Sequence, residues 1–444
     1  MMKISQSAFR PFSFGSLLVF LVVLAPAGPA LMAQALPAAE AAPISTGFAF
    51  PSNLGSLQYA VSASQSLTWG FYGNSGAAAA TNVTGDIAYL SNSKADPFSL
   101  VFSGGHAFSE TSYEPSYSFL NLAFSQVITA GRWNIVLSDS VNYLPGTPVT
   151  GLSGVAGVGD VGVNPVQVGS DTGQGILTNY SSRVSNVASG SVARHLTGKT
   201  SLTASGSYST TQFLGGSSSE SQGLNSDAAT GAGGVTHQVN ARNTFGGNYS
   251  YMTFNYPQNN LGLPAVNFVS QVASGFFSHQ FTRKFGMTAA AGPEWTKVGN
   301  SGSGTGLSLF VDTTATYAAK TSTLSAAFLR STAGGNGVVG GALSDSATLS
   351  ASHRFWMVWN VSVTSGYTQS SNLPVANAPA YTVNTVVSSL QVSRAILRSL
   401  SGYASYTFED QHYSGSAIDI YSGDTQVVGF GVTYSPPAAH LGHQ

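Results

Sequence analysis

The feature that most constrains this chain is a pattern that recurs from near residue 56 almost to the C-terminal end. Stretches of about ten residues alternate apolar and polar side chains, and a turn follows each stretch. In the last stretch, Phe430 and Val432 fall on one face and Gly431 and Thr433 on the other. Successive side chains of a β-strand point to opposite faces, so the pattern predicts strands with one apolar and one polar face.

Composition decides which kind of β protein this is. A soluble sandwich shows the same alternation, but only 7% of these residues are charged, against roughly a quarter in an ordinary soluble domain. After the N-terminal leader, no segment approaches the ~18 unbroken apolar residues of a membrane-spanning helix. We therefore predict an all-β protein, a transmembrane antiparallel up-and-down β-barrel with lipid outside and a polar lumen. In such a barrel, Arg should be tolerated better at Gly431, on the water face, than at Phe430, on the lipid face.

The N-terminus has the pattern of a secretory signal peptide. Lys3 and Arg10 precede a short apolar run, and Ala33-Gln34-Ala35 offers a cleavage site. The expected organisation is a signal peptide over 1–35, a periplasmic lead-in over 36–55, a barrel over 56–435 and a tail over 436–444. Export and a barrel together predict the bacterial outer membrane as the location. The chain has 17 acidic and 16 basic residues, and cleavage removes two of the basic ones, which excludes nucleic acid as a partner.

The alternating stretches predict about eighteen strands, with sixteen as the alternative because the first two are weak. Single-chain bacterial barrels have an even number of strands and both ends in the periplasm, so the short turns face the periplasm and the long connections face outward. The expected strand centres lie near residues 63, 86, 103, 122, 138, 190, 206, 236, 250, 273, 290, 313, 327, 350, 363, 390, 404 and 430.

Charges separate by sign along this pattern, which predicts an electropositive periplasmic mouth and an electronegative outer mouth. Basic residues lie at or beside the short turns, among them Arg132, Arg194, Lys199, Arg242, Lys284, Lys320, Arg354, Arg394 and Arg398. Acidic residues lie in or beside the long connections, among them Glu110, Asp160, Asp171, Asp227, Asp345, Glu409 and Asp424.

The histidines do not predict a metal or catalytic site. His195, His237, His279 and His353 each lie a few residues before a short turn, where barrels place amphipathic side chains at the membrane interface. No H-x-x-x-H or H-E-x-x-H motif and no G-x-S-x-G elbow occurs in the chain. We expect no enzyme activity, no cofactor and no metal ligand.

The final strand, 427–434, carries a glycine followed by a hydrophobic residue and an aromatic residue two apart. It is similar to the terminal signal that the barrel assembly machinery recognises, although it ends ten residues before the terminus. The chain as a whole resembles the bacterial outer-membrane β-barrel superfamily and is porin-like in size. The resemblance implies the assembly machinery as a partner during biogenesis, membrane lipid and lipopolysaccharide as surroundings, and a possible homo-oligomer.

The function that fits best is a passive channel for small polar solutes, neutral or weakly cationic. Asp312, Gln426 and Thr433 are the candidate lumen-facing residues. Two alternatives stay open: a barrel that exports a polysaccharide as part of a secretion system, and a structural or adhesin-like surface barrel.

The longest connection, 144–178, predicts a constriction of the lumen. It is rich in glycine and valine, and its only charged residues are Asp160 and Asp171. An exposed loop with so many apolar residues would be adhesive, so we expect it to fold inward and to bring both aspartates near the narrowest point. The resemblance to general porins, in which the loop after the fifth strand behaves this way, points in the same direction.

Overall fold

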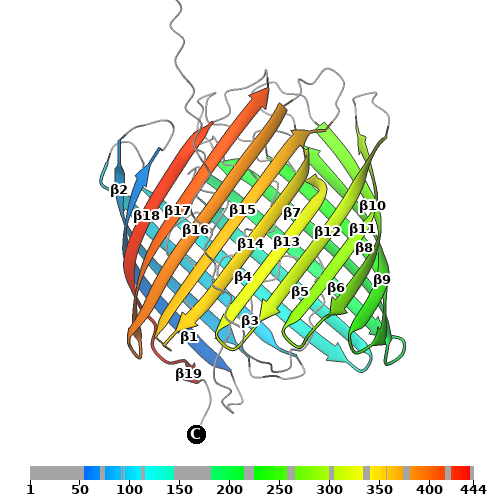
Figure 1. Ribbon diagram of the computed structural model, residues 1–444, viewed down its shortest axis with the longest axis horizontal. Coiled ribbons are helices and arrows are strands. Elements are labelled where there is room, and N and C mark those ends of the chain that lie inside the picture. Colours follow the sequence, from blue (N-terminus) through cyan, green and yellow to red (C-terminus); the bar gives the residue numbers. More distant parts are fainter. Residues whose placement is uncertain are drawn as a thin grey trace, which may run out of the picture.

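The computed structural model describes residues 55–70, 76–91, 93, 96–111, 116–144, 182–214, 225–257, 266–299, 305–333, 341–356, 358–373, 381–415 and 422–440. The described residues form one antiparallel sheet of eighteen long strands, which are tilted and close into a barrel. A two-residue strand, β19, lies at the lower end of this barrel (Figure 1). Every predicted strand centre falls inside one of the eighteen strands, which confirms that number over sixteen. In the described ranges, no helix is long and apolar enough to cross a membrane. The strands are β1 Ser56–Trp69, β2 Ala78–Leu90, β3 Phe98–Ser109, β4 Tyr117–Ala130, β5 Trp133–Leu144, β6 Ser182–His195, β7 Thr200–Leu214, β8 Ser226–Asn240, β9 Asn243–Tyr256, β10 Val266–Gln280, β11 Phe285–Val298, β12 Gly306–Ala318, β13 Ser322–Ala333, β14 Ala342–Phe355, β15 Trp359–Asn372, β16 Tyr381–Leu397, β17 Leu400–Gly415, β18 Gly423–Tyr434 and β19 Ala439–His440.

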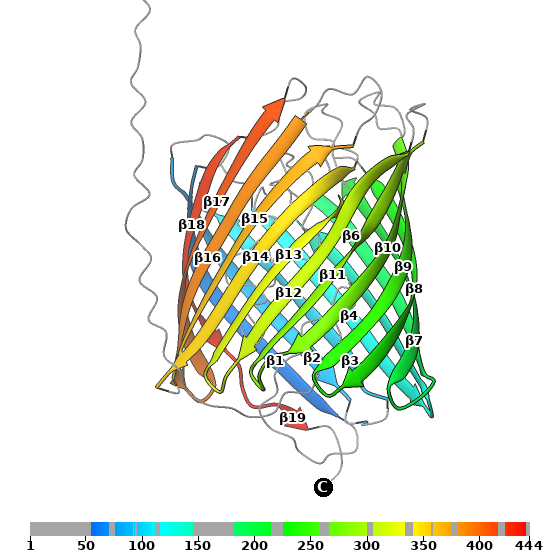
Figure 2. The same cartoon turned by 45° about the vertical axis from the view of Figure 1, so that its right-hand side comes forward.

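The barrel closes where β18 pairs with β1, for example at Ala63–Val432. Every other long strand pairs with its neighbours in the sequence, which is the up-and-down order (Figure 2). β19, in the predicted tail, pairs with the start of β1 at Ser56–His440. The predicted signal peptide and nearly all of the predicted lead-in lie outside the described residues.

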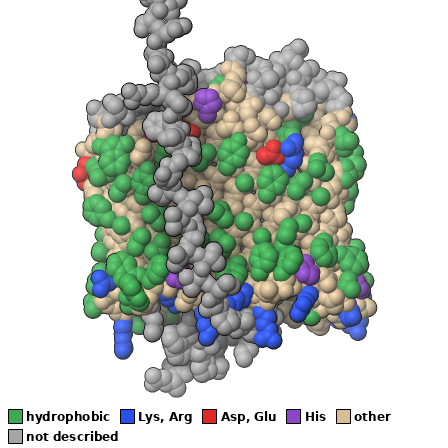
Figure 3. Space-filling view, viewed as in Figure 1, with side chains coloured by type: hydrophobic (Ala, Val, Ile, Leu, Met, Phe, Trp, Pro, Cys, Tyr) green, Lys and Arg blue, Asp and Glu red, His purple; other side chains and the backbone are tan. Residues whose placement is uncertain are grey.

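Alternation along each strand separates the two surfaces of the wall. On β18, the outward Phe430 and Val432 are 54% and 47% exposed, whereas the inward Thr425 and Thr433 are 1% and 0% exposed. Large apolar side chains are exposed in the same way on strands all around the barrel, and Figure 3 shows them on one side of it. An apolar exterior suits lipid, and a closed barrel leaves no sheet edge in the hydrocarbon.

Basic side chains line the barrel end that carries the short turns, at the lower edge of Figure 3. Two of the basic residues at this end stack on tryptophans: Arg194 lies over Trp133 and Arg394 over Trp359, each at 5.1 Å from the ring centroid. Arg–Trp pairs of this kind are expected at a membrane interface, because the ring lies in the headgroup region and the cation reaches water.

Of the four histidines that precede short turns, three lie on the outward face of the barrel at this lower interface. Each bonds through Nδ1 to the residue directly across on the preceding strand, and each contacts a phenylalanine. The pairs are His237 with Thr200 (2.9 Å), His279 with Asn243 (2.6 Å) and His353 with Ser322 (2.6 Å). The recurrence agrees with the expected position of these histidines, each a few residues before a short turn at the membrane interface.

The upper interface repeats a different outward pair. A tyrosine on an ascending strand donates its hydroxyl to a polar side chain on the next strand, two residues before the tyrosine's own cross-strand partner. The four pairs are Tyr208–Asp227 (3.3 Å), Tyr249–Gln271 (2.9 Å), Tyr367–Asn384 (3.1 Å) and Tyr406–Gln426 (3.2 Å). These pairs mark a polar boundary above the apolar band.

The spacing of the two boundaries matches a membrane. On β15, Trp359 lies at the lower boundary, and Gln369, paired with Asn384, lies ten residues higher. At ~3.3 Å per residue and a tilt of about 40°, this distance spans about 25 Å along the barrel axis, the height of the apolar band in outer-membrane barrels.

Candidate functional site: the inward-facing wall

The inward face of the barrel is lined mainly by small polar side chains. Cross-strand hydroxyl pairs bond to one another, such as Ser62–Thr433 at 2.7 Å and Ser138–Ser189 at 2.6 Å. These residues alternate with the lipid-facing positions, so the same strands that carry the apolar band also carry the polar lining. Such a lining offers hydrogen bonds to a solute and little charge.

The charges on this wall are unequal. On the described strands, the alternation places four acids inward: Asp86 on β2, Glu294 on β11, Asp312 on β12 and Glu409 on β17. The inward basic residues are Arg183, near the start of β6, and Arg354, beside the lower rim on β14. The wall between the two rims is therefore acidic.

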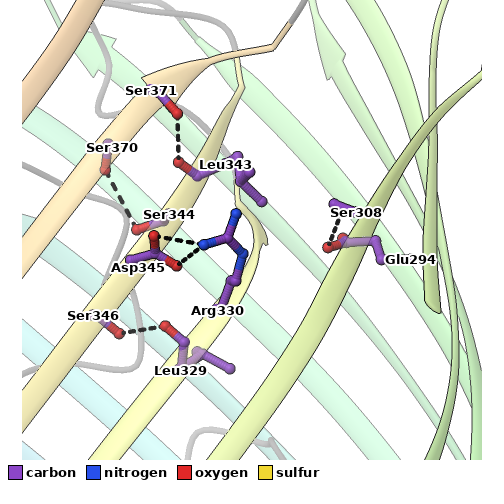
Figure 4. A network of polar contacts seen from close by, with 10 residues as sticks. All are labelled: Glu294, Ser308, Leu329, Arg330, Leu343, Ser344, Asp345, Ser346, Ser370 and Ser371. Atoms are coloured by element: carbon purple, nitrogen blue, oxygen red, sulfur yellow. Dashed lines mark hydrogen bonds and ion pairs between the residues drawn. The ribbon is translucent and has the colours of Figure 1, made fainter. Parts of the chain in front are cut away.

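Glu294 is buried, 1% exposed, and its carboxylate binds donors from three other strands; Figure 4 shows the contact with Ser308. Oε1 accepts from Ser270 Oγ on β10 at 2.6 Å, and Oε2 accepts from Ser308 Oγ on β12 at 3.1 Å. The backbone N–H of Thr332 on β13 donates to both oxygens, at 3.0 and 3.2 Å. This carboxylate is fully bonded and holds the upper wall together.

Glu409 is equally buried, 1% exposed, but differs in its bonding. Neither of its carboxylate oxygens has a hydrogen-bond partner within the described part of the chain. It faces Thr425 across β18 and Val387 across β16. The Thr425 hydroxyl oxygen, itself buried, has no partner in the same set of residues either.

An apolar cluster interrupts the polar lining near the upper mouth. Tyr256, Phe268, Val298 and Leu373 are all buried, and Phe254 stacks on Phe268 with ring centroids 4.4 Å apart. Phe268 is inward on β10, which explains why the stretch 268–281 alternates poorly in sequence: an inward position there is apolar, and an outward one, Gln271, is polar.

The three candidate lumen residues are placed differently. Thr433 shares the inward face of β18 with Thr425, and Asp312 shares the inward face of β12 with Ser308. Gln426 lies on the outward face with Phe430 and bonds to Tyr406, so its expected position in the lumen is corrected. The reason is geometric: positions 426 and 433 are an odd number of residues apart, and a regular strand cannot put both on one face.

The two predicted constriction residues, Asp160 and Asp171, lie outside the described residues. Sequence reasoning did not single out Glu294. The available signal was a lone acid inside an alternating stretch, in step with Thr296 and out of step with Trp295. Within the described ranges, no three His, Asp or Glu side chains gather in a way that could hold a metal ion.

A closed antiparallel barrel of eighteen strands, apolar outside and polar inside, is a transmembrane β-barrel of the bacterial outer membrane. No protein-family model matches the sequence, and no curated protein matches it.

The solved structures to which the chain is similar include three proteins of Pseudomonas aeruginosa at 10–11% identity. They are OpdQ (TM-score 0.41, 10% identity, covering 86% of this chain and 98% of that one), OccK2, also called OpdF (0.43, 10%, 85% and 98%), and the outer membrane protein OpdK (0.41, 11%, 86% and 98%).

Proposed function

We propose that this protein is a passive diffusion channel of the outer membrane for small polar solutes, neutral or weakly cationic. An eighteen-stranded barrel is too wide for inward side chains to fill, so it encloses an aqueous path. The hydroxyl-rich lining supports the passage of polar solutes, because Ser and Thr replace part of a solute's hydration without binding it tightly.

The observation that carries the solute class is the charge of the inward wall. Asp86, Glu294, Asp312 and Glu409 face inward, while the inward Arg183 and Arg354 lie near the two mouths. A wall with this balance attracts cations modestly and disfavours anions. We further propose that the connection 144–178 narrows the path, with Asp160 and Asp171 at the narrowest point; this rests on its sequence.

The test is conductance of the purified protein in planar bilayers under a KCl gradient. We expect stepwise openings and a reversal potential that shows a weak preference for K⁺ over Cl⁻. Liposomes that contain the protein should swell faster in a small neutral sugar than in an anionic solute of the same size. Absence of stepwise conductance, both in the wild type and after deletion of residues 150–172 from the connection 144–178, would refute the channel function. A preference for Cl⁻ over K⁺ would refute the proposed solute class.

A further inference from the structure

Two glutamates on the inward wall allow a direct comparison. Glu294 and Glu409 are the same residue type, each is 1% exposed, and each lies on the inner face of a strand. The Glu294 carboxylate accepts hydrogen bonds from Ser270, Ser308 and Thr332. The Glu409 carboxylate accepts none from the described residues. Burial is therefore the same for the two groups, and only the supply of donors differs.

A buried carboxylate without donors is strongly unfavourable in its charged form, so native proteins rarely leave one unmatched. An ion or a ligand that supplies the missing donors is one explanation for such a group. Glu409 lies on the inner face of the barrel wall and is 1% exposed, so a solute contacts its carboxylate only after the residues that cover it move aside. The missing donors can thus come from a solute.

The surroundings of Glu409 indicate the chemistry of that solute. The carboxylate supplies one negative charge, and the Thr425 hydroxyl directly across β18 supplies another unpartnered oxygen acceptor. Hard divalent cations favour several carboxylates in one cage, and no cluster of three potential metal ligands occurs among the described residues. One charge with neutral acceptors instead matches a monovalent cation that carries N–H donors.

Apolar residues beside Glu409 can contact the carbon chain of such a solute, next to its charged group. Val387 lies directly across β16 from Glu409, and Val427 follows Thr425 on the inward face of β18. Both valines are buried, at 6% and 8% exposure. They offer contact to the methylene groups that adjoin the amine of an alkylammonium or alkylguanidinium ion.

We propose that Glu409 and Thr425 form a binding site inside the barrel for the ammonium or guanidinium group of a small solute. The proposal deepens the proposed channel function, on which it rests, by assigning the cation preference to one position on the wall. Glu409 accepts the charged N–H groups, Thr425 accepts a further hydrogen bond, and the two valines contact the adjoining carbon chain.

The experiment measures binding without requiring conduction. The full-length protein, refolded in detergent micelles, is titrated with n-butylammonium and with n-butanol, and binding is followed by ligand-observed NMR. The wild type should bind the ammonium and not the alcohol. Glu409→Gln should weaken binding about tenfold or more, since it removes a charge-assisted hydrogen bond.

The matched control is Asp410→Asn. Asp410 is the next residue along β17 and faces outward, so the variant removes the same charge at the same height from the opposite surface. It should leave the affinity within about twofold of the wild type. Thr425→Val keeps the shape of the side chain and removes its hydroxyl, and it should weaken binding about threefold. If Glu409→Gln fails to fold, the binding measurement on Thr425→Val still tests the proposed site.

Three outcomes would overturn the site: no binding of n-butylammonium to the wild type, equal binding by the Glu409 or Thr425 variants and the wild type, or an equal loss in Asp410→Asn. Conductance in planar bilayers separates this inference from the channel function. A barrel that conducts but does not bind n-butylammonium refutes only the site, and one that binds but does not conduct refutes only the channel.

Discussion

Glu294 on β11 accepts the backbone N–H of Thr332 on β13, at 3.0 Å to Oε1 and 3.2 Å to Oε2, although β12 lies between the two strands in the sheet. The pairing of β12 with β13 ends at Val311–Arg330, below the upper ends of both strands. Above that point, the Glu294 carboxylate accepts a hydrogen bond that a neighbouring strand's carbonyl would otherwise accept. A side chain thereby closes a gap in the backbone ladder of the wall.

Glu294→Ala should destabilise the barrel by about 1–3 kcal/mol, because it leaves the Thr332 N–H and the hydroxyls of Ser270 and Ser308 without their acceptor. Glu294→Gln keeps one acceptor oxygen in place and should cost less. Denaturant titration of the protein refolded into lipid vesicles measures both variants. Wild-type stability in the alanine variant would show that the carboxylate does not support the wall.

Phe430→Arg should destabilise the barrel by about 2–4 kcal/mol if the side chain lies near the membrane midplane, since it puts a charge against lipid. Phe430 is 54% exposed on the outward face of β18. Phe430→Leu is the control and should change stability little, because it stays apolar. An arginine variant as stable as the leucine variant would contradict the outward assignment of this face.

The sequence pattern places Gly431 on the water face, where a side chain should be tolerated. The structure, however, leaves no room for a side chain at this position. A Cβ there would lie 2.6 Å from Ser64 Cβ and 2.7 Å from the Ala63 carbonyl oxygen, at the β1–β18 closure. Gly431→Ala should therefore cost about 1–3 kcal/mol through overpacking, and Gly431→Arg more. Gly231 is the matched control, because a Cβ there meets nothing within 4 Å. Equal stability of the two alanine variants would show that closure accommodates the extra atom.

Arg330 and Asp345 form an ion pair at 3.0 Å on the outward face of β13 and β14 (Figure 4). The pair lies at the level of Gln369, the upper boundary of the apolar band. Asp345→Leu should cost about 1–3 kcal/mol, because it leaves the Arg330 charge unpaired at the edge of the lipid. The double variant Arg330→Leu with Asp345→Leu should recover most of that loss in vesicle unfolding experiments. A double variant less stable than the single one would mean that both charges contact polar groups of the membrane.

Deletion of residues 150–172 should raise single-channel conductance several-fold and leave the barrel folded, because it removes the connection that we propose to narrow the path. Folding is checked by the heat-dependent shift of gel mobility that closed barrels show. The double variant Asp160→Asn with Asp171→Asn should leave conductance near its wild-type value and reduce the preference for K⁺. A deletion that folds and conducts like the wild type would rule out a constriction by this connection.

The number and position of the strands could be predicted because each strand's alternation is local. The stretch around Phe430 predicted β18, and even the two weak first stretches marked β1 and β2, because a single period of two and a following turn identify a strand. The same local signal indicated the polar face that contains Glu409, since it is in step with Thr407 on β17. It did not show that Glu409 lacks donors in the part of the chain that the structure describes, because those would come from other strands.

The sequence by itself determined an antiparallel barrel of about eighteen strands, with Phe430 and residues like it facing lipid, because side-chain period and turn spacing are properties of contiguous residues. Only the tertiary structure decided the contacts between strands. It joined Ala63 to Val432, bonded Glu294 to Thr332, and left the equally buried Glu409 without a donor among the described residues. These outcomes depend on the relative heights of strands far apart in the chain, and that stagger is set when the whole sheet curls and closes.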